Sequence, residues 1–404
     1  MNVIYYISTL RLPTEKAYGV NMVKTCEALG KQETDLRLIT PRLRQLAEKN
    51  IYEYYGAAQS FSVAFLPSID LVHYTLSFNL WLWRRGITSR PVFSWRWLYF
   101  AFLLDQLLLA ISIWVYFSLG SRRPVIYTRS VLVGSGLKIL GYQIYYDMHG
   151  FPYRFQWFWR LILRRFDGLT VTNHWKAERC RKLFKIKDDR ILVAPNGFDA
   201  EAYGRPIDRQ KIRQSLVSNP TRPIALYAGH LYDWKGAHVF ALAAESLPEI
   251  DCVFIGGSDE DCKNFRQRFK GSNLMILGRK PYSDIAGYLR SADVLVQPNP
   301  GLSSESRLSH FATYDTSPIK LFEYLASGTT IVATDLPATS EILNQHNSVL
   351  VKPNDSSSLA QGIKRALADS QLAKQLARRA LIDVQQYSWS ARAGAILGFI
   401  YHDH

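Results

Sequence analysis

Cysteine and the common catalytic signatures are scarce in this 404-residue sequence. The four cysteines, Cys26, Cys180, Cys252 and Cys262, form no CxxC pair, so we expect a reducing compartment and no structural zinc. There is no Walker A motif for a nucleoside triphosphate, and no nucleophile elbow that would support a Ser/His/Asp triad. The opening residues "MNVIYYIS" run directly into a strand-like stretch without a basic region, so we expect no signal peptide.

Acidic residues are also few, 34 against 49 lysines and arginines, which gives a net charge of +15. Such a surplus favours an anionic partner: nucleic acid, a phosphorylated substrate or an acidic lipid surface. No helix-turn-helix, zinc-finger or aromatic RNA-binding motif is visible, so nucleic acid is the least favoured of the three. The one acidic cluster, Asp259 to Asp261, fits the D-x-D pattern of a cation site. Acids at a helix start also favour the helix dipole, and we expect no metal here.

Apolar runs rich in β-branched and aromatic residues alternate with helical stretches along the chain. They predict strands within residues 2–8, 35–40, 124–130, 142–149, 168–173 and 190–196, and again within 223–229, 252–257, 274–278, 293–299, 329–335 and 348–353. Continuously apolar strands that alternate with helices form parallel sheets covered on both faces. Because 404 residues exceed one ordinary core, we predict an α/β protein of two facing, doubly wound, Rossmann-like domains.

A polar stretch with Gly204 and Pro206 predicts the linker between these domains. We place the N-terminal domain at residues 1–205 and the start of the C-terminal domain at residue 206. Parallel sheets bind ligands beyond the carboxyl ends of their strands. The site is therefore expected in the cleft between the two domains.

Leu98 to Leu119 breaks the pattern, because it is apolar on nearly every face and long enough to span a bilayer. A single pass is disfavoured, since the strands predicted before and after it belong to one sheet. A buried core helix and a helix lying in a membrane surface remain as interpretations. Flanking aromatic and basic residues favour the membrane surface: Trp81, Trp83, Trp95, Trp97, Trp114, Arg84, Arg85, Arg90, Arg96, Arg122 and Arg123. A second aromatic and basic patch runs from Phe151 to Lys187.

The stretch "TSPIKLFEYLASG" predicts a short helix with Ser317 as its cap, Pro318 at its first position and Gly328 at its end. A helix start holds phosphate through its free N–H groups and its dipole. Lys320 lies at this start, and Lys235 lies at another predicted helix start. One diphosphate would satisfy both lysines. The carboxylates of Asp315 and Glu323 would suit sugar and ribose hydroxyls.

Taken in order, several segments resemble the retaining glycosyltransferases of family four, which have the GT-B fold. They are "LPTEKAYGVNMVKTCEAL" at 12–29, "PNGFD" at 195–199, "GHLYDWKG" at 229–236, "LGRKPYSDIAGYLRSADVLVQPN" at 277–299, "SPIKLFEYLASGTTIVATDLP" at 317–337 and "YSWSARAGAIL" at 387–397. The resemblance covers nearly the whole chain. It implies a donor domain at residues 206–386 and a helix at 387–404 that crosses back to the N-terminal domain.

The resemblance also implies roles for single residues. Glu323 matches the second acid of the family's E-x7-E motif, which grips the nucleotide ribose, and Asp315 stands where the first acid would be. Lys235 matches the lysine that neutralises the donor diphosphate, and His230 replaces an arginine five positions before it. The other matched residues are Gly19, whose loop lets the backbone approach the donor phosphates, and His149, which sits near the transferred sugar.

We therefore expect His149, Lys235 and Glu323 to be catalytic. The donor side comprises Gly19, His230, Lys235, Asp315, Thr316, Ser317, Pro318, Ile319, Lys320 and Glu323, and the acceptor side Asn21, His149, Gly150 and Asn173. The predicted reaction moves a sugar from a nucleotide diphosphate sugar, with retention and without metal or cofactor. The expected acceptor is a membrane-associated glycan or lipid-linked saccharide at the inner face of the cytoplasmic membrane.

Two alternatives stay open. A GT-B sugar-nucleotide epimerase would need acid/base carboxylates facing the sugar, and the "KLFEYLASG" block argues against it. A sugar-nucleotide-binding protein without catalysis is favoured only by the substitutions at His230 and Asp315.

Overall fold

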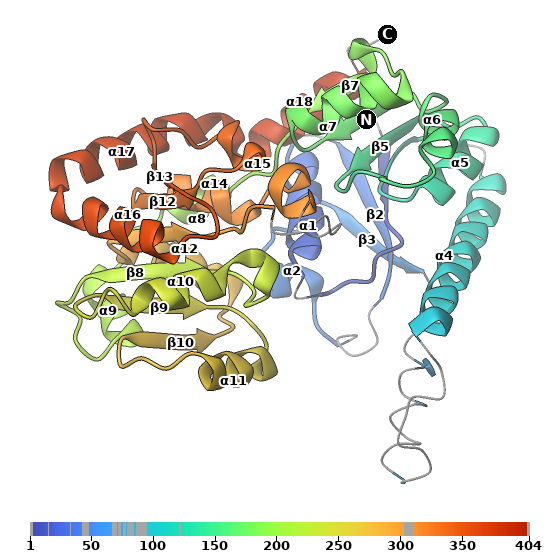
Figure 1. Cartoon of the computed structure of the whole chain (residues 1–404). Helices are drawn as coiled ribbons and strands as arrows, with labels where there is room; N and C mark the ends of the chain where they lie inside the picture. Colours follow the sequence, from blue (N-terminus) through green and yellow to red (C-terminus); the bar gives the residue numbers. More distant parts are fainter. Residues whose placement is uncertain are drawn as a thin grey trace.

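The computed structural model describes residues 3–401, except for 15, 33, 43–47, 121–122, 303–309 and most of 67–94. Two parallel sheets organise the chain (Figure 1). The first contains β1 (Val3–Ile7), β2 (Asp35–Pro41), β3 (Ser62–Leu66), β4 (Val125–Thr128), β5 (Ile144–Met148), β6 (Gly168–Val171) and β7 (Ile191–Val193). The second contains β8 (Ile224–Ala228), β9 (Asp251–Ile255), β10 (Leu274–Gly278), β11 (Val294–Gln297), β12 (Thr330–Thr334) and β13 (Val349–Val351).

The strand orders are those of doubly wound sheets. The first runs β3-β2-β1-β4-β5-β6-β7 and the second β10-β9-β8-β11-β12-β13. In each sheet the order reverses beside the first strand, between β1 and β4 and between β8 and β11, where a doubly wound sheet opens its ligand crevice. The predicted GT-B arrangement of two facing Rossmann-like domains is confirmed. All twelve predicted strands are present, and β3 at the edge of the first sheet was not predicted.

Helices cover both faces of each sheet. Around the first sheet they are α1 (Ala17–Gly30), α2 (Ile51–Tyr55), α4 (Trp95–Ser118), α5 (Val131–Ile139), α6 (Gln156–Leu163), α7 (His174–Arg179) with the π-helical turn η2 (Cys180–Phe184), and α18 (Trp389–Tyr401). Around the second they are α8 (Ala200–Gly204), α9 (Arg209–Leu216), α10 (Ala237–Ala244), α11 (Asp259–Arg268), α12 (Tyr282–Ser291), α14 (Ile319–Ala326), α15 (Pro337–Ser340), α16 (Ser356–Ala368) and α17 (Ser370–Asp383). Single turns complete the chain: η3 (Asp188–Arg190), η4 (Asp233–Lys235), η5 (Phe311–Asp315) and η6 (Val384–Tyr387).

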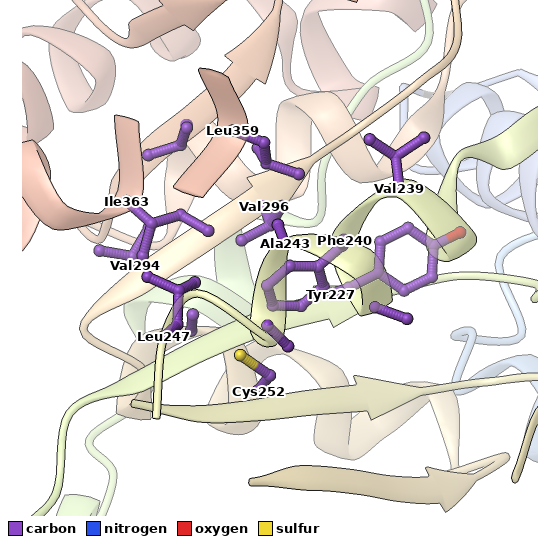
Figure 2. Packing of buried hydrophobic residues seen from close by; sticks show 14 of the residues in the cluster. Tyr227, Val239, Phe240, Ala243, Leu247, Cys252, Val294, Val296, Leu359 and Ile363 are labelled. Carbon is purple, nitrogen blue, oxygen red and sulfur yellow. The ribbon is translucent and has the colours of Figure 1, made fainter. Parts of the chain in front are cut away.

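Each domain has its own buried core. In the second domain Val239, Phe240 and Ala243 of α10 pack between Tyr227 of β8 and the residues of α16, as Figure 2 shows. These side chains are almost fully removed from water, and burial of this kind is the main favourable term in folding. β7 ends at Val193 and β8 begins at Ile224, so residue 205 lies between the two sheets. The domain boundary itself stays a prediction.

The last helix, α18, belongs spatially to the first domain. Trp389, Ala393, Ile396 and Ile400 are buried in the same cluster as the inner residues of α1. The backbone of Phe198 pairs with the chain just before α18, where Trp389 N donates to Phe198 O over 3.1 Å. At Gly197 an added Cβ would lie 2.7 Å from the carbonyl oxygen of Tyr387, so only glycine leaves room for this crossing.

Helix α4 has one buried face and one exposed face. It packs on α5 and on the sheet through buried Leu109, Ala110, Ile113 and Phe117. The opposite face exposes Trp97, Tyr99, Phe100, Phe102, Leu103, Leu107, Ile111, Val115 and Tyr116. Among the described residues it is the one helix long and apolar enough to cross a membrane, and one third of its apolar window is buried. In Figure 1 it lies on the side of the first domain that faces away from the second.

Two of the polar or aromatic residues of α4 have internal roles. Asp105, the one acid of the helix, is buried in an ion pair with Arg11 beyond β1. Trp114 does not flank the helix as an interfacial anchor, which corrects the expectation. Its Nε1 donates to Val133 O over 3.2 Å, and its ring occupies the space over Gly136, where an added Cβ would approach to 2.1 Å. Of the other expected anchors, Trp81, Trp83, Arg84, Arg90 and Arg122, and the side chains of Trp95 and Arg96, lie outside the described residues.

Candidate active site

Two lysines lie close together on the donor side. Lys235 ends the turn η4 after β8, and its Nζ lies 4.0 Å from the centre of the Trp234 ring. Lys320 lies in the first turn of α14, with its Nζ 4.2 Å from the centre of the Tyr227 ring. Burial lowers the pKa of Lys235 to about 8. Burial and the nearby charge of Lys235 hold the pKa of Lys320 well below its usual value, so the two ammonium groups repel each other.

Neither ammonium group forms an ion pair with any described carboxylate, and Lys320 Nζ is buried without a hydrogen-bond partner. A buried cation without a partner is costly unless an anion arrives. Gly236, directly after Lys235, fixes the geometry here. It has φ +79°, and a Cβ on it would lie 1.7 Å from the carbonyl oxygen of Pro298, so the turn can approach the β11 loop only with glycine.

Glu323 lies one turn further along α14 and is buried. Burial is the main reason that its pKa is raised to about 7, and the negative charge of Asp199 adds to the rise. The hydroxyl of Tyr282 in α12 and the charge of Lys320 act in the opposite direction. The carboxyl group therefore stands beside one phenol and one ammonium group. Such a carboxyl group can accept hydrogen bonds from a pair of hydroxyls.

The start of α14 differs from the expected cap. Pro318, and not Ser317, is the residue that precedes the first helical position, and no side chain caps the helix. Just before the helix, Asn196 donates through Nδ2 to the carbonyl oxygen of Ser317. Ile319 packs against the core of the first domain. Gly328 follows the end of the helix with φ +71°, as expected of a residue that terminates a helix.

Asp315 is not oriented as a free sugar-binding acid. Its Oδ1 lies 2.9 Å from the Nζ of Lys176 in α7, and its Oδ2 accepts from the backbone N–H of Phe151 over 2.8 Å. Both side chains of this ion pair are almost completely buried. Asp315 thus joins the donor domain to the first domain. Thr316, beside it, is also buried, and its N–H donates to Phe311 O over 2.9 Å.

Two further donor-side residues have packing roles. His230 stacks on Tyr232 with ring centres 4.9 Å apart, and its carbonyl oxygen accepts from the Tyr227 hydroxyl over 2.7 Å. Gly19 lies inside α1, where an added Cβ would come within 2.2 Å of the Tyr55 hydroxyl. That hydroxyl in turn holds both backbone polar groups of Thr14. This close approach of Tyr55 is one reason why position 19 requires glycine.

On the acceptor side His149 stands at the end of β5 above a buried charge cluster. Its Nε2 lies 2.9 Å from Asp147 Oδ2 and 2.7 Å from Arg129 Nη2. Asp147 also receives Tyr6 Oη over 2.7 Å, Arg129 Nε over 2.9 Å and Arg392 Nη2 over 3.1 Å. Burial opposes the charge of Asp147, but His149 and the arginines hold its pKa well below the usual value. Burial and the charge of Arg129 lower the pKa of His149 to about 4.

The remaining predicted acceptor-side residues differ in whether they are already hydrogen-bonded within the protein. Asn21 accepts from Arg129 Nη2 and donates to Asn196 Oδ1. Asn173 accepts from Lys176 N over 3.0 Å and donates to the carbonyl oxygen of Tyr314 over 3.0 Å. Both asparagines are buried and hydrogen-bonded, and Asn173 connects the two domains, so they are not free for an acceptor in this structure. Gly150 is exposed, with open space where a Cβ would stand.

Three residues of the site, Arg129, Arg392 and Tyr282, were not predicted from the sequence. Arg129 directly follows β4, a strand end, and that position was the available signal. Arg392 lies in α18, and nothing in its own segment indicates the strand-end carboxylate that it meets. A chain of hydrogen bonds thus runs from Asp147 through Arg129, Asn21 and Asn196 to Ser317 O at the start of α14, and joins the acceptor side to the donor side.

The acidic cluster at the start of α11 has a helix-capping role. Ser258 caps the helix, and its backbone N–H donates to Asp261 Oδ2 over 2.9 Å. Among the described residues no group of three or more histidine, cysteine, aspartate or glutamate side chains is placed to hold a metal ion. A cavity of about 270 Å³ also opens between the domains, lined by residues of α7, η6 and α18, by the end of β7 and by Glu341 and Ile342, which follow α15. Neither lysine nor Glu323 lines it, so it is separate from the predicted donor site.

Part of this chain matches a known protein family. The family model described as "Glycosyl transferases group 1" matches residues 208–382, which include Lys235, Lys320 and Glu323. This C-terminal region of the chain therefore matches the glycosyl transferases group 1 family. Among curated relatives of the chain, a D-inositol 3-phosphate glycosyltransferase of Xylanimonas cellulosilytica is 27% identical over 245 residues, 57% of this chain and 56% of the relative. A phosphatidyl-myo-inositol mannosyltransferase of Mycolicibacterium smegmatis is 29% identical over 244 residues, 58% and 56% of the two chains.

The chain spans about half the length of the curated relatives that it matches. Solved structures extend the likeness to the whole fold. Sucrose-phosphate synthase from Thermosynechococcus elongatus superposes with a TM-score of 0.74 at 18% identity, over 100% of this chain and 98% of the other. Anabaena HepE in complex with UDP-glucose superposes with a TM-score of 0.69 at 16% identity, over 99% of each chain.

Proposed function

We propose that this chain transfers a sugar from a nucleotide diphosphate sugar to an acceptor, with retention at the anomeric carbon and without a metal or cofactor. The observation that carries the proposal is the pair of mutually repelling ammonium groups of Lys235 and Lys320, whose side chains are half-buried, with Glu323 on the same helix as Lys320. A diphosphate would neutralise both lysines. The ribose hydroxyls of the nucleotide would donate to the carboxylate of Glu323. The HepE complex with UDP-glucose supports a donor of this class.

The proposed chemistry follows from where charge develops. The bond between the anomeric carbon and the leaving phosphate oxygen breaks, and the lysines stabilise the diphosphate that departs. The acceptor hydroxyl forms the new bond on the same face of the sugar. Its proton passes to the departing phosphate oxygen. His149, with its low pKa, is a neutral imidazole at pH 7 and would contact the sugar as a hydrogen-bond partner without adding charge.

A panel of nucleotides and nucleotide sugars in a thermal-shift assay tests the donor site, since a specific ligand raises stability by mass action. The donor so found is then incubated with the protein without acceptor, and free sugar is measured. We expect Lys235→Ala and Glu323→Ala to lose turnover while remaining folded, and exposed Lys263→Ala to behave as the parent. Normal donor affinity and turnover in both site variants would contradict the proposal. Release of an epimerised sugar, or binding without turnover, would favour the alternative functions.

We further propose that the acceptor is presented at an anionic membrane surface, at the inner face of the cytoplasmic membrane. The exposed apolar face of α4 supports this, as does α6, where Phe155, Trp157, Phe158 and Leu161 are exposed beside exposed Arg154, Arg160, Arg164 and Arg165. Aromatic and basic side chains together suit the headgroup region of acidic lipids. One curated relative carries a lipid in its name, phosphatidyl-myo-inositol mannosyltransferase, which supports a lipid-linked acceptor.

A further inference from the structure

We propose that Arg129 is a positioning residue for His149, holding the imidazole in one orientation and one tautomer through a contact shared with Asp147. The proposal rests on the proposed function, in which His149 contacts the transferred sugar. Arg129 lies directly after β4, at the strand end beside β5, and its side chain is 6% exposed. No described residue other than Arg129 and Asp147 hydrogen-bonds the His149 ring.

The contact between the two side chains fixes the proton on the ring. A guanidinium group can only donate and stays protonated in proteins. His149 Nε2 lies 2.7 Å from Arg129 Nη2 and 2.9 Å from Asp147 Oδ2, and we assign its lone pair to the shorter contact, with the proton on Nδ1. A proton on Nε2 would suit Asp147 but would oppose the N–H group of Arg129. Nδ1–H is then the polar group that the ring can offer to a sugar hydroxyl, and 28% of the side chain is exposed.

The surroundings of the ring explain why a cation is needed there. Asp147 alone would draw a proton onto Nε2 and form an ion pair with an imidazolium. Arg129 occupies the same carboxylate oxygen over 2.9 Å, so the negative charge of Asp147 is already satisfied. Tyr6 from β1 and Arg392 from α18 complete the set of groups on this carboxylate. The lowered pKa of His149 agrees with this arrangement.

Arg129 also reaches toward the donor side. Its Nη2 donates to Asn21, which donates to Asn196, which donates to the carbonyl oxygen of Ser317 before α14. The orientation of the ring is thus tied to the backbone at the start of the helix that carries Lys320 and Glu323. A residue placed in this way acts on the reaction through His149 and not by touching the donor itself.

Nuclear magnetic resonance of protein labelled in its nine histidines reads the tautomer directly, without any substrate. His149→Gln identifies the His149 signals by their loss. In the parent we expect an Nδ1–H tautomer between pH 5 and 8. In Arg129→Gln we expect a proton on Nε2, shared with Asp147, and titration at a pH higher by about one unit or more. Arg123→Gln, which changes an arginine bound to Gly120 O and Tyr142, should leave the His149 signals unchanged.

A kinetic cycle tests whether Arg129 acts through the histidine. We expect Arg129→Gln and His149→Gln each to lower kcat at least about tenfold, and the double variant to be no worse than about twofold below His149→Gln. Arg129→Lys keeps a cation beside buried Asp147 and should recover part of kcat. It serves as a control in case the glutamine variant loses activity through a folding defect. An unchanged tautomer in Arg129→Gln, or multiplicative losses in the double variant, would overturn the proposal. If the tautomer changes but the parent turns over no donor, the positioning stands and the proposed reaction falls.

Discussion

At Glu323 burial and charge act against each other. Burial raises the pKa of this carboxyl group to about 7, although Tyr282 and Lys320 favour its ionised form. The folded protein therefore binds a proton between about pH 4.5 and 7 that the unfolded chain has already released. Stability falls as pH rises through this window, because the charged carboxylate is better solvated in the unfolded chain. Binding residues held in a costly state are typical of functional sites.

Glu323→Gln should therefore stabilise the protein at high pH. We expect the free energy of unfolding to increase by about 1–3 kcal/mol at pH 8 and to change little at pH 4.5, because one pKa unit corresponds to about 1.4 kcal/mol. Urea denaturation at the two pH values measures this. Glu245→Gln, an exposed change on the same domain, serves as the control and should be neutral at both. A loss of stability at pH 8 would show that Glu323 is held by partners stronger than Tyr282 and Lys320.

Asp259 to Asp261 give a second prediction at this scale. The reciprocal cap between Ser258 and Asp261 accounts for these acids as the first turn of α11. We expect donor hydrolysis to continue in EDTA, and Ser258→Ala to cost about 1 kcal/mol of stability without altering turnover. Activity that stops in EDTA and returns with magnesium or manganese would contradict this prediction.

Individual residues were predictable where the local pattern is sufficient. Lys235 and Lys320 each lie near a helix start, and the structure brings the two lysines close together, with Glu323 one turn beyond Lys320 on the same helix. Asp315 and Asn173 were predicted as site residues, but they are held by partners from the other domain. A sequence does not show which polar group across an interface will take up a side chain. The contact of Arg392 with Asp147 could not be predicted either, because 245 residues separate the two in the sequence.

Among the elements, α4 was predicted only in part. Its apolar composition was recognised from the sequence, but composition does not show which face of the helix packs against the rest of the domain. The structure buries Leu109 and Ile113 and leaves Leu103, Leu107 and Ile111 between 40% and 44% exposed. β3 was not predicted, although Val63 to Leu66 are all apolar. It lies at the edge of the sheet, and none of its residues is fully buried.

Replacing Leu103, Leu107 and Ile111 with serine should abolish binding to anionic liposomes while the protein stays folded. Sedimentation with vesicles at low and high salt measures binding, since salt screens the contribution of the arginines beyond about 8 Å. The matched control replaces buried Leu109 and Ile113 with serine and should unfold the protein or cost several kcal/mol. A parent protein that leaves the liposomes at low salt would contradict the membrane proposal.

At the scale of the whole molecule, the two domains are joined by buried polar contacts near the site. The ion pair of Lys176 with Asp315 is the central one, and both side chains are at most 1% exposed. Removing one partner of such a pair leaves an uncompensated charge, which costs more than the pair itself contributes. Domain closure is thus tied to the segment that leads into α14.

We expect Lys176→Met to destabilise the protein by about 3–5 kcal/mol. Adding Asp315→Asn should recover part of this loss, because the amide oxygen can still accept from Phe151 N while the buried charge is gone. Denaturant unfolding of the two single variants and the double variant measures the coupling. Additive losses would show that the pair does not interact across the interface.

The position of α18 has a consequence for how the protein is made. A chain emerges from the ribosome from its N-terminus, and domains generally fold in that order during synthesis. Here the 13 residues of α18 cover the first sheet and bring Arg392 to Asp147, yet they are translated after the elements of the second sheet. The first domain must therefore wait, with one face open, until the second has been made. Expression of residues 1–205 alone should yield a protein that aggregates.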